Sequence, residues 1–397
     1  MKHIWIGGVA PKVRFEELME IGDNQFAANN VQLLYIEGIE KVIGKKMEII
    51  SSHFIPDFSK NKILHFKKNK YDNFTEIGFI NLPIFKQITK LINVSKEVKR
   101  IINDNLNEEL IFYIYSMTTP IMYSAKTIRK LSKKKKLNKI KIVQIIPDLP
   151  QYMNFEKRNF LWKFAKKIDI KVLYKLLNYI DKYIIFSKYM LEKLNVKKEN
   201  VMVVEGLIDY NYKIEKNITK ENIIMYAGGI NKDYGVYDLI DSFVSANIKD
   251  YELHLYGPVS NELDLRNKIS PYKNIKYFGC VSRDKILELE KKSMLLINPR
   301  KPEKEFTKYS FPSKTMEYLM SGTPLLMYKL KSIPREYDNY IFYINNTNKD
   351  ILKNELIKVC SIKKNDLINK GKLAQKFICE NKNNIVQCNK IIKFILD

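Results

Sequence analysis

The segment Ser310–Pro324 holds residues whose types and spacing suit them to binding phosphate. Proline is favoured in the first turn of a helix and glycine just past its end, so Pro312 and Gly322 predict a helix between them. Ser313 and Lys314 then lie at the start of this helix. Free backbone N–H groups and the helix dipole bind anions at such a start, and Lys314 adds a full positive charge. We therefore expect an anion site here.

Two further charged residues flank the predicted helix start. Arg300 follows the apolar run Leu296–Asn298, which predicts a strand that ends at the carboxyl edge of a parallel sheet. Glu317 lies one turn into the helix, where its carboxylate can accept hydrogen bonds from ribose hydroxyls. Cations, free N–H groups and a carboxylate together indicate a site for a nucleoside diphosphate. A capped helix with charged residues on its surface would have the same spacing, and this alternative remains open.

Two series of short apolar runs, separated by helical segments, must position these residues. A chain of 397 residues suits two domains, and this alternation predicts two consecutive doubly wound parallel sheets. The lysine-rich stretch Asn211–Glu221 is the predicted linker. The strands expected before it are Lys2–Ile6, Lys46–Ser51, Leu110–Tyr115, Lys141–Ile146, Tyr183–Phe186 and Val201–Val204. Those expected after it are Ile223–Tyr226, Glu252–Tyr256, Ile275–Phe278, Met294–Asn298 and Pro324–Tyr328.

The run Glu317–Pro324 (EYLMSGTP) resembles the signature of retaining glycosyltransferases of family 4, which have two Rossmann-like domains (the GT-B fold). That family carries two glutamates eight positions apart, and Tyr309 occupies the first of these positions here. The resemblance therefore implies that Tyr309 replaces the usual carboxylate beside the donor sugar. The residues Phe311–Lys314 resemble a subgroup found among bacterial surface-polysaccharide enzymes.

Other segments follow the order of the same family. Tyr226–Val236 resembles the strand and loop that open the donor domain, and Leu255–Pro258 and Tyr277–Val281 resemble the next two strand–turn units. The resemblance implies that backbone approaches the donor at three glycines and that a lysine replaces phosphate-binding cations of the family; these residues are Gly229, Gly257, Gly279 and Lys232.

The first domain offers two candidate sites. Gly7 and Gly8 follow the first predicted strand and resemble the family's glycine turn near the donor diphosphate, although a tight strand–helix turn would also need glycine. Asp148 follows the strand that ends at Ile146. It either holds an acceptor hydroxyl or caps the next turn.

The resemblance implies transfer with retention at the anomeric carbon and neither a cofactor nor a metal. The donor is a nucleotide diphosphate sugar, and the acceptor is a glycan or lipid-linked saccharide in surface polysaccharide biosynthesis. The departing charge would be stabilised by Ser313 and Lys314, with Arg300 and Lys232 in support. We expect an acceptor domain over 1–210, a donor domain over 211–375 and, over 376–397, a C-terminal helix that packs back on the first domain. The alternatives are a nucleotide-sugar epimerase of the same fold or a non-catalytic basic binding protein.

The net charge of +25 calls for an anionic partner. Lys126–Lys141 holds nine basic residues and no acidic one, and Phe155–Tyr183 mixes lysines with bulky aromatics. This pattern favours an anionic membrane surface, although a solvated loop and a helix with core-packed aromatics would also fit. No recognition motif for nucleic acid is present. The opening residues read as a strand and not as a secretion signal, so we expect a cytoplasmic protein, peripheral at the inner face of the cell membrane.

Overall fold

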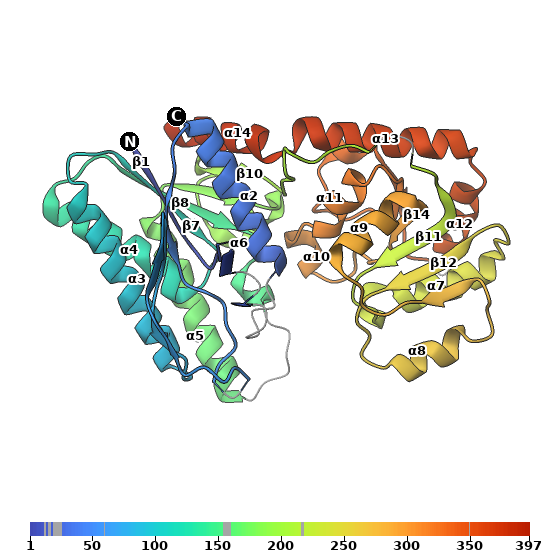
Figure 1. The fold of residues 1–397 in the computed structure, drawn as a ribbon, viewed down its shortest axis with the longest axis horizontal. Helices are drawn as coiled ribbons and strands as arrows, with labels where there is room; N and C mark the ends of the chain where they lie inside the picture. Colours follow the sequence, from blue (N-terminus) through green and yellow to red (C-terminus); the bar gives the residue numbers. More distant parts are fainter. Residues whose placement is uncertain are drawn as a thin grey trace. The chain divides into compact units, whose positions relative to one another are not determined.

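The computed structural model describes residues 1–11, 13–14, 17–18, 26–58, 60–153, 160–215, 218–348 and 350–397. The chain forms two compact units (Figure 1). The first comprises Met1–Leu207 with Asn384–Asp397, and the second comprises Ile208–Asn383. Each unit is a mainly parallel sheet with helices packed against it, so the expected class of two Rossmann-like doubly wound domains is confirmed.

The first unit is built on an eight-stranded sheet in the order β10-β9-β8-β7-β1-β2-β5-β4. All neighbouring strands in it are parallel except β5 and β4. The strands are β1 (Lys2–Gly7), β2 (Glu48–Ser51), β4 (Asn69–Tyr71), β5 (Phe74–Glu76), β7 (Leu110–Tyr115), β8 (Ile140–Ile146), β9 (Lys182–Ile185) and β10 (Val201–Val203). The helices are α2 (Phe26–Ile43), α3 (Phe85–Asp104), α4 (Thr119–Lys135), α5 (Phe160–Leu176), α6 (Leu191–Leu194) and α14 (Asn384–Leu396).

An aromatic cluster forms the centre of the first core. The Trp5 ring on β1 stacks on Tyr113 and Tyr115 of β7, with ring centres 6.3 and 5.8 Å away. Helix α14 brings Cys388 into the same core, so the end of the chain packs within the first unit. Burial of these large apolar surfaces provides the main stabilisation of the unit.

The second unit has a six-stranded, all-parallel sheet in the order β13-β12-β11-β14-β15-β16. The strands are β11 (Glu221–Ala227), β12 (Glu252–Tyr256), β13 (Ile275–Tyr277), β14 (Ser293–Asn298), β15 (Leu325–Tyr328) and β16 (Ile341–Ile344). The helices are α7 (Val236–Ala246), α8 (Glu262–Ile269), α9 (Arg283–Lys292), α10 (Phe306–Tyr309), α11 (Ser313–Met320), α12 (Ile351–Cys360) and α13 (Lys364–Asn381). Strand order reverses between β11 and β14, and ligands of open α/β sheets bind at the carboxyl edge beside such a reversal.

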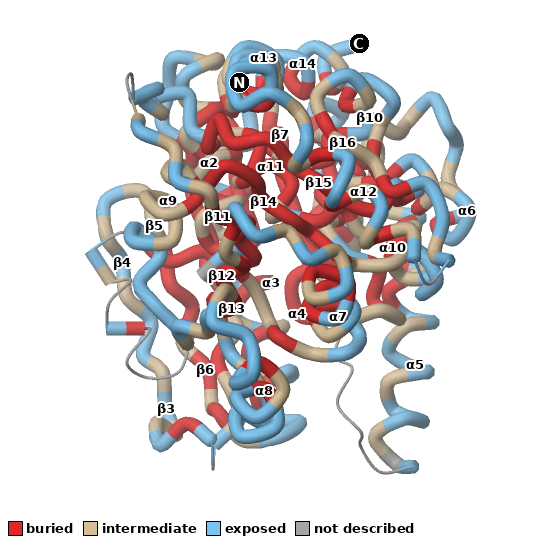
Figure 2. Tube along the Cα trace, turned by 90° about the vertical axis from the view of Figure 1, so that its right-hand side faces the viewer, coloured by how far each residue is buried: buried red, intermediate tan, exposed pale blue. Residues whose placement is uncertain are grey.

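Several details differ from the sequence expectations. The structure has strands that were not expected: β4 and β5 at the edge of the first sheet, the separate antiparallel pair β3 (His65–Phe66) and β6 (Phe79–Ile80), and β16 in the second sheet. Strand β15 begins at Leu325 because Pro324 has no N–H to donate within a sheet. Figure 2 shows that the central strands are buried, whereas much of α5 is exposed.

Candidate functional site

Helix α11 begins at Ser313, as the sequence predicts. Pro312 occupies the N-cap position rather than the first helical turn, with extended backbone at φ −70° and ψ 111°. Its carbonyl accepts a hydrogen bond from the N–H of Thr315 at 2.9 Å. Ser313 is exposed and Lys314 is half-buried, so the free N–H groups at this start are open to a ligand.

The tyrosine in the middle of α11 ties the helix to the sheet. The Tyr318 hydroxyl accepts a hydrogen bond from the Ala227 N–H at 3.0 Å and donates one to the Ala227 carbonyl at 3.2 Å. Ala227 is the last residue of β11, directly before Gly228. The hydrogen bonds therefore hold the helix start next to the glycine turn that follows β11.

Lys314 and Glu317 interact at the exposed side of this helix start. Their Nζ and Oε1 atoms lie 3.4 Å apart, and the other carboxylate oxygen of Glu317 lies 3.4 Å from a guanidinium nitrogen of Arg283. The Lys314 stem crosses the glycine turn, because a Cβ built on Gly228 would lie 3.3 Å from Lys314 Cε. Lys314 and Arg283 thus hold the Glu317 carboxylate. The Glu317 side chain remains 20 % exposed, so its carboxylate can still accept hydrogen bonds from hydroxyl groups.

A second carboxyl group, which the sequence analysis missed, lies behind Glu317. Glu290 on α9 is fully buried. Burial raises the pKa of Glu290 well above its usual range, and the neighbouring Glu317 carboxylate raises it further. The folded protein therefore favours the protonated form of Glu290. Nothing in the local sequence of α9 indicates this, since the burial depends on the packing of α9 against distant parts of the sheet.

The glycine turns after β11, β12 and β13 lie side by side. Gly228 donates its N–H to the Tyr256 carbonyl at 2.9 Å, and Gly257 donates to the Gly279 carbonyl at 2.8 Å. Gly257 has a φ of +126°, and a Cβ there would lie 2.1 Å from the Gly228 oxygen, so glycine is required. Gly279, with a φ of +72°, has open space around the place of a Cβ. The close approach of Gly228 thus accounts for glycine at position 257, and a ligand role for Gly257 and Gly279 stays a prediction.

Arg300 lies where the loops after β14 and β11 meet. Its guanidinium carbon lies 4.3 Å from the Phe306 ring centre and 5.7 Å from that of Tyr234. Gly229 approaches the same tyrosine, since a Cβ there would lie 3.3 Å from a Tyr234 ring carbon. Lys232 is exposed, and its ammonium lies 5.8 Å from the Tyr237 ring centre on α7. Arg300 and Gly229 thus both lie next to the Tyr234 ring, whereas Lys232 lies over Tyr237 of α7.

Tyr309 is almost fully buried at the end of α10. Its hydroxyl donates a hydrogen bond at 3.4 Å to a carboxylate oxygen of Glu305, one turn earlier. Glu305 carries no local sequence signal that marks it as a site residue. The position at which a carboxylate is expected therefore carries a tyrosine whose hydroxyl contacts a neighbouring carboxylate.

In the first unit, Gly7 at the end of β1 and Gly8 directly after it leave space that neighbouring side chains occupy. A Cβ on Gly7 would lie 2.2 Å from Oε1 of Gln32, and a Cβ on Gly8 would lie 2.2 Å from the Phe54 ring. The Gly8 N–H donates to the same Gln32 oxygen at 3.1 Å. These contacts support the tight-turn interpretation, and a ligand role for Gly7 and Gly8 stays a prediction.

Asp148 is exposed in the turn after β8. Burial raises the pKa of the Tyr115 hydroxyl, and the charge of Asp148 raises it further, which places the two side chains near each other. The 3₁₀ turn Pro150–Tyr152 that follows has Leu149 at its N-cap, so Asp148 does not occupy the capping position. Its role at an acceptor stays a prediction.

A buried ionic cluster at the carboxyl edge of the first sheet was also missed by the sequence analysis. His53 Nε2 lies 3.2 Å from Oε1 of Glu76, the last residue of β5, and Arg14 Nε lies 3.5 Å from the same oxygen. Burial alone would raise the pKa of Glu76, but the interactions with His53, Asn69 and Arg14 together outweigh it and the pKa is lowered. The cluster ties together three segments at this edge.

The comparisons with known proteins agree with this fold. Residues 210–394 match the family described as glycosyl transferases group 1. No curated protein matches the sequence significantly. Among solved structures, HepE from Anabaena in complex with UDP is similar over 100% of this chain and 99% of that chain, with a TM-score of 0.64 and 15% identity.

Two further solved structures share the architecture. Sucrose-phosphate synthase from Thermosynechococcus elongatus has a TM-score of 0.63 and 11% identity, over 100% of this chain and 99% of that one. The pneumococcal O-GlcNAc transferase GtfA in complex with UDP and GlcNAc has a TM-score of 0.56 and 11% identity, over 100% and 98%. Identities this low establish the fold alone, which is the GT-B fold. Together with the family match, this fold supports the glycosyltransferase superfamily.

Proposed function

We propose that the chain transfers a sugar from a nucleotide diphosphate sugar, with the donor bound at the carboxyl edge of the second sheet. The observation that carries the proposal is the start of α11, where Lys314 and the held carboxylate of Glu317 lie beside the glycine turn after β11. The helix start and Lys314 would bind the diphosphate, and Glu317 would accept hydrogen bonds from the ribose. The family match over residues 210–394 supports the same use of this unit.

The proposed reaction breaks the bond between the anomeric carbon and the diphosphate oxygen and forms a bond to an acceptor hydroxyl. Negative charge grows on the departing diphosphate. Fixed hydrogen-bond donors at Ser313 and Lys314 would stabilise this negative charge, with Arg300 and Lys232 as supporting cations. These residues would then supply the positive charge that a metal ion supplies in metal-dependent transferases. Such donors are typically worth about 3–4 kcal/mol each. The proposal includes retention of the anomeric configuration, as the resemblance to family 4 implies.

Tyr309 and Glu305 are proposed to replace the missing glutamate beside the donor sugar. The Tyr309 hydroxyl lies 3.4 Å from the Glu305 carboxylate, so a carboxylate is present within one helical turn of the expected position. Its hydrogen-bonding capacity would orient a sugar hydroxyl. On this proposal Glu305 and Tyr309 act as one unit.

The acceptor is proposed to be a glycan or a lipid-linked saccharide in surface polysaccharide synthesis, with Asp148 near its hydroxyl. Exposure of Asp148 at the carboxyl edge of the first sheet supports this role, because a carboxylate there is open to an incoming hydroxyl. The proposed class of acceptor and the proposed role of Asp148 both rest on the family resemblance and on the position of Asp148 at this edge.

The protein is further proposed to dock on an anionic membrane through α5. No described helix combines the length and apolar character that crossing a bilayer requires. Along α5, four apolar side chains spaced four residues apart are exposed: Phe160, Phe164, Ile168 and Val172. Exposed lysines lie between them, so the helix suits an interface with anionic lipid. Phe155, Lys157 and Arg158 of the predicted basic stretch lie outside the described residues.

A thermal-shift screen of the full chain against UDP, GDP, ADP and their common sugars tests the donor proposal. A ligand that binds the native state at 100 times its dissociation constant adds about 2.7 kcal/mol of stability. We expect one nucleotide to raise the unfolding temperature and its sugar conjugate to be consumed only when an acceptor is added. Consumption of the conjugate without acceptor would indicate an epimerase instead.

A further inference from the structure

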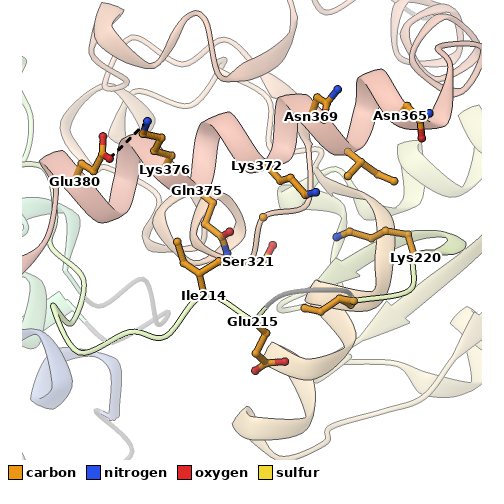
Figure 3. A pocket seen from close by; sticks show the side chains of 13 residues that line it. Ile214, Glu215, Lys220, Ser321, Asn365, Asn369, Lys372, Gln375, Lys376 and Glu380 are labelled. Atoms are coloured by element: carbon orange, nitrogen blue, oxygen red, sulfur yellow. Dashed lines mark ion pairs between the residues drawn. The ribbon is translucent and has the colours of Figure 1, made fainter.

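A cavity of about 910 Å³ lies within the second unit, at the amino edge of its sheet (Figure 3). Lys220, which lines it, directly precedes β11, whereas the donor edge lies past the other end of this strand. Seven residues of β11 separate the two edges by about 23 Å at the usual rise per residue. The cavity is therefore distinct from the proposed donor site, and its volume lies within the range of small-molecule sites.

Two lysines from different segments converge in this cavity. Figure 3 shows the ammonium groups of Lys220 and of Lys372 on α13 pointing toward one another. Lys220 is largely buried and donates to the Lys291 carbonyl at 2.7 Å and to the Thr323 hydroxyl. Burial, with a smaller contribution from the charge of Lys372, lowers the pKa of Lys220 to about 7. Two like charges thus face each other in a partly desolvated space.

The acidic residues of the cavity are engaged elsewhere. Glu215 pairs with Lys291 at 2.5 Å, and Glu380 pairs with Lys376 at 3.9 Å on the same helix. Within the part of the chain that the structure describes, no carboxylate pairs with Lys220 or Lys372. An anion bound between the two ammonium groups would replace their mutual repulsion with attraction.

The other groups that line the cavity indicate which class of anion would fit it. The Gln375 amide donates to the Met320 carbonyl at 2.7 Å, and the Ser321 hydroxyl donates to the Tyr318 carbonyl at 2.6 Å, so these polar groups already have partners. The two lysines then dominate recognition, and two cations match the charge of a phosphate monoester, close to −2 at neutral pH. Isoleucines provide apolar wall for the rest of the molecule: Ile214, Ile218 and Ile368.

We propose that this cavity is a second ligand site of the protein, which binds a small phosphate monoester between Lys220 and Lys372. The proposal concerns binding at the amino edge of the second sheet and does not depend on the donor site. The helix α11 ends at this cavity, since Ser321 and Gly322 line it.

Calorimetric titration of the full chain with glucose 6-phosphate at about pH 6.5 tests the proposal, because Lys220 is then mostly protonated and the phosphate mostly dianionic. We expect saturable binding of glucose 6-phosphate and none of glucose. Lys372→Ala should weaken binding at least about tenfold, since Lys372 supplies one of the two charges. Lys364→Ala, which removes an exposed lysine of the same helix outside the cavity, should leave the affinity unchanged.

A phosphate could also bind at the donor edge, and Lys314→Ala separates the two sites. If glucose 6-phosphate occupies the proposed cavity, Lys314→Ala retains wild-type affinity for it. The proposal is overturned if wild-type protein does not bind glucose 6-phosphate, if Lys372→Ala binds it as tightly as wild type, or if the affinity falls in Lys314→Ala. Each of these results leaves the donor proposal to be tested by nucleotide binding.

Discussion

The Tyr318 hydroxyl bonds both backbone polar groups of Ala227, at 3.0 Å to its N–H and 3.2 Å to its carbonyl. The two residues are 91 positions apart in the chain. Ala227 ends β11 and Tyr318 lies one turn past Lys314 on α11. A single buried side chain therefore sets the spacing between the helix start and the glycine turn, which are the two parts of the proposed phosphate site.

Tyr318→Phe should lower both stability and nucleotide affinity. The change leaves the buried Ala227 N–H without its acceptor, which costs about 1–3 kcal/mol. We expect a lower unfolding temperature and weaker UDP binding, measured by differential scanning calorimetry and titration. Tyr237→Phe is the matched control, because the Tyr237 hydroxyl donates to Asp264 at an exposed site. Equal effects of the two substitutions would show that Tyr318 has no special role.

Glu290→Gln should make the stability of the folded protein less sensitive to rising pH. Burial and Glu317 raise the pKa of Glu290 well above its unfolded value near 4.5, so the folded state holds a proton that the unfolded state releases. Folded stability contributed by this group is complete below about pH 4.5 and declines as the pH rises. The variant lacks this decline, so its unfolding temperature relative to wild type should increase between pH 5 and pH 8.

Glu288→Gln on the same helix is the control for this pH series. Hydrogen bonds from Lys292 and Lys285 lower the pKa of the exposed Glu288 to about 2, so its stabilising contribution is lost only as the pH falls from 4.5 toward 2. The difference from wild type should then stay constant between pH 5 and pH 8. A constant difference for Glu290→Gln as well would mean that Glu290 is ionised in the folded protein.

Gly257→Ala should destabilise the protein more than Gly44→Ala. Both glycines have positive φ, at +126° and +67°, which costs an alanine about 1–2 kcal/mol. Only at Gly257 would the new Cβ also lie 2.1 Å from the Gly228 oxygen, whereas nothing lies within 4 Å at Gly44. Chemical unfolding measures the two losses. Losses of the same size would contradict the close packing of the glycine turns.

Replacing Phe160 and Phe164 by serine should reduce binding to vesicles of phosphatidylglycerol and phosphatidylcholine. These rings are 79 % and 58 % exposed, so folding loses little, whereas a buried phenylalanine contributes about 1.5–3 kcal/mol in the interface. Cosedimentation should fall at least about tenfold. Leu263→Ser, at a 70 % exposed site on α8, is the control and should leave binding unchanged. Unchanged sedimentation of the double variant would refute docking through α5.

The start of α11 was predictable because its signals are local. Pro312 and Gly322 bracket the helix within eleven residues of sequence, and the apolar runs of the central strands are equally direct. The strands β3 and β6 are too short to show a pattern, since each pairs only two residues. Their formation depends on the surrounding packing.

The contacts that complete the candidate site were not predictable in the same way. Glu290 and Lys220 are ordinary charged residues in the sequence, and their burial arises from the approach of segments that are far apart in the chain. The partner of Tyr318 is likewise 91 residues away. Glycines are an intermediate case: Gly257 was expected to face a ligand, but its close approach to Gly228 is visible only in three dimensions.

Calorimetric titration of UDP into wild type, Lys314→Ala and Lys364→Ala tests the donor site most directly. Lys314 lies at the start of α11, whereas Lys364 is exposed at the start of α13. We predict that wild type and Lys364→Ala bind one UDP with equal affinity and that Lys314→Ala binds it at least about tenfold more weakly. Unchanged affinity in Lys314→Ala, or no binding of UDP, GDP or ADP by wild type, would contradict a nucleoside diphosphate site at this helix start.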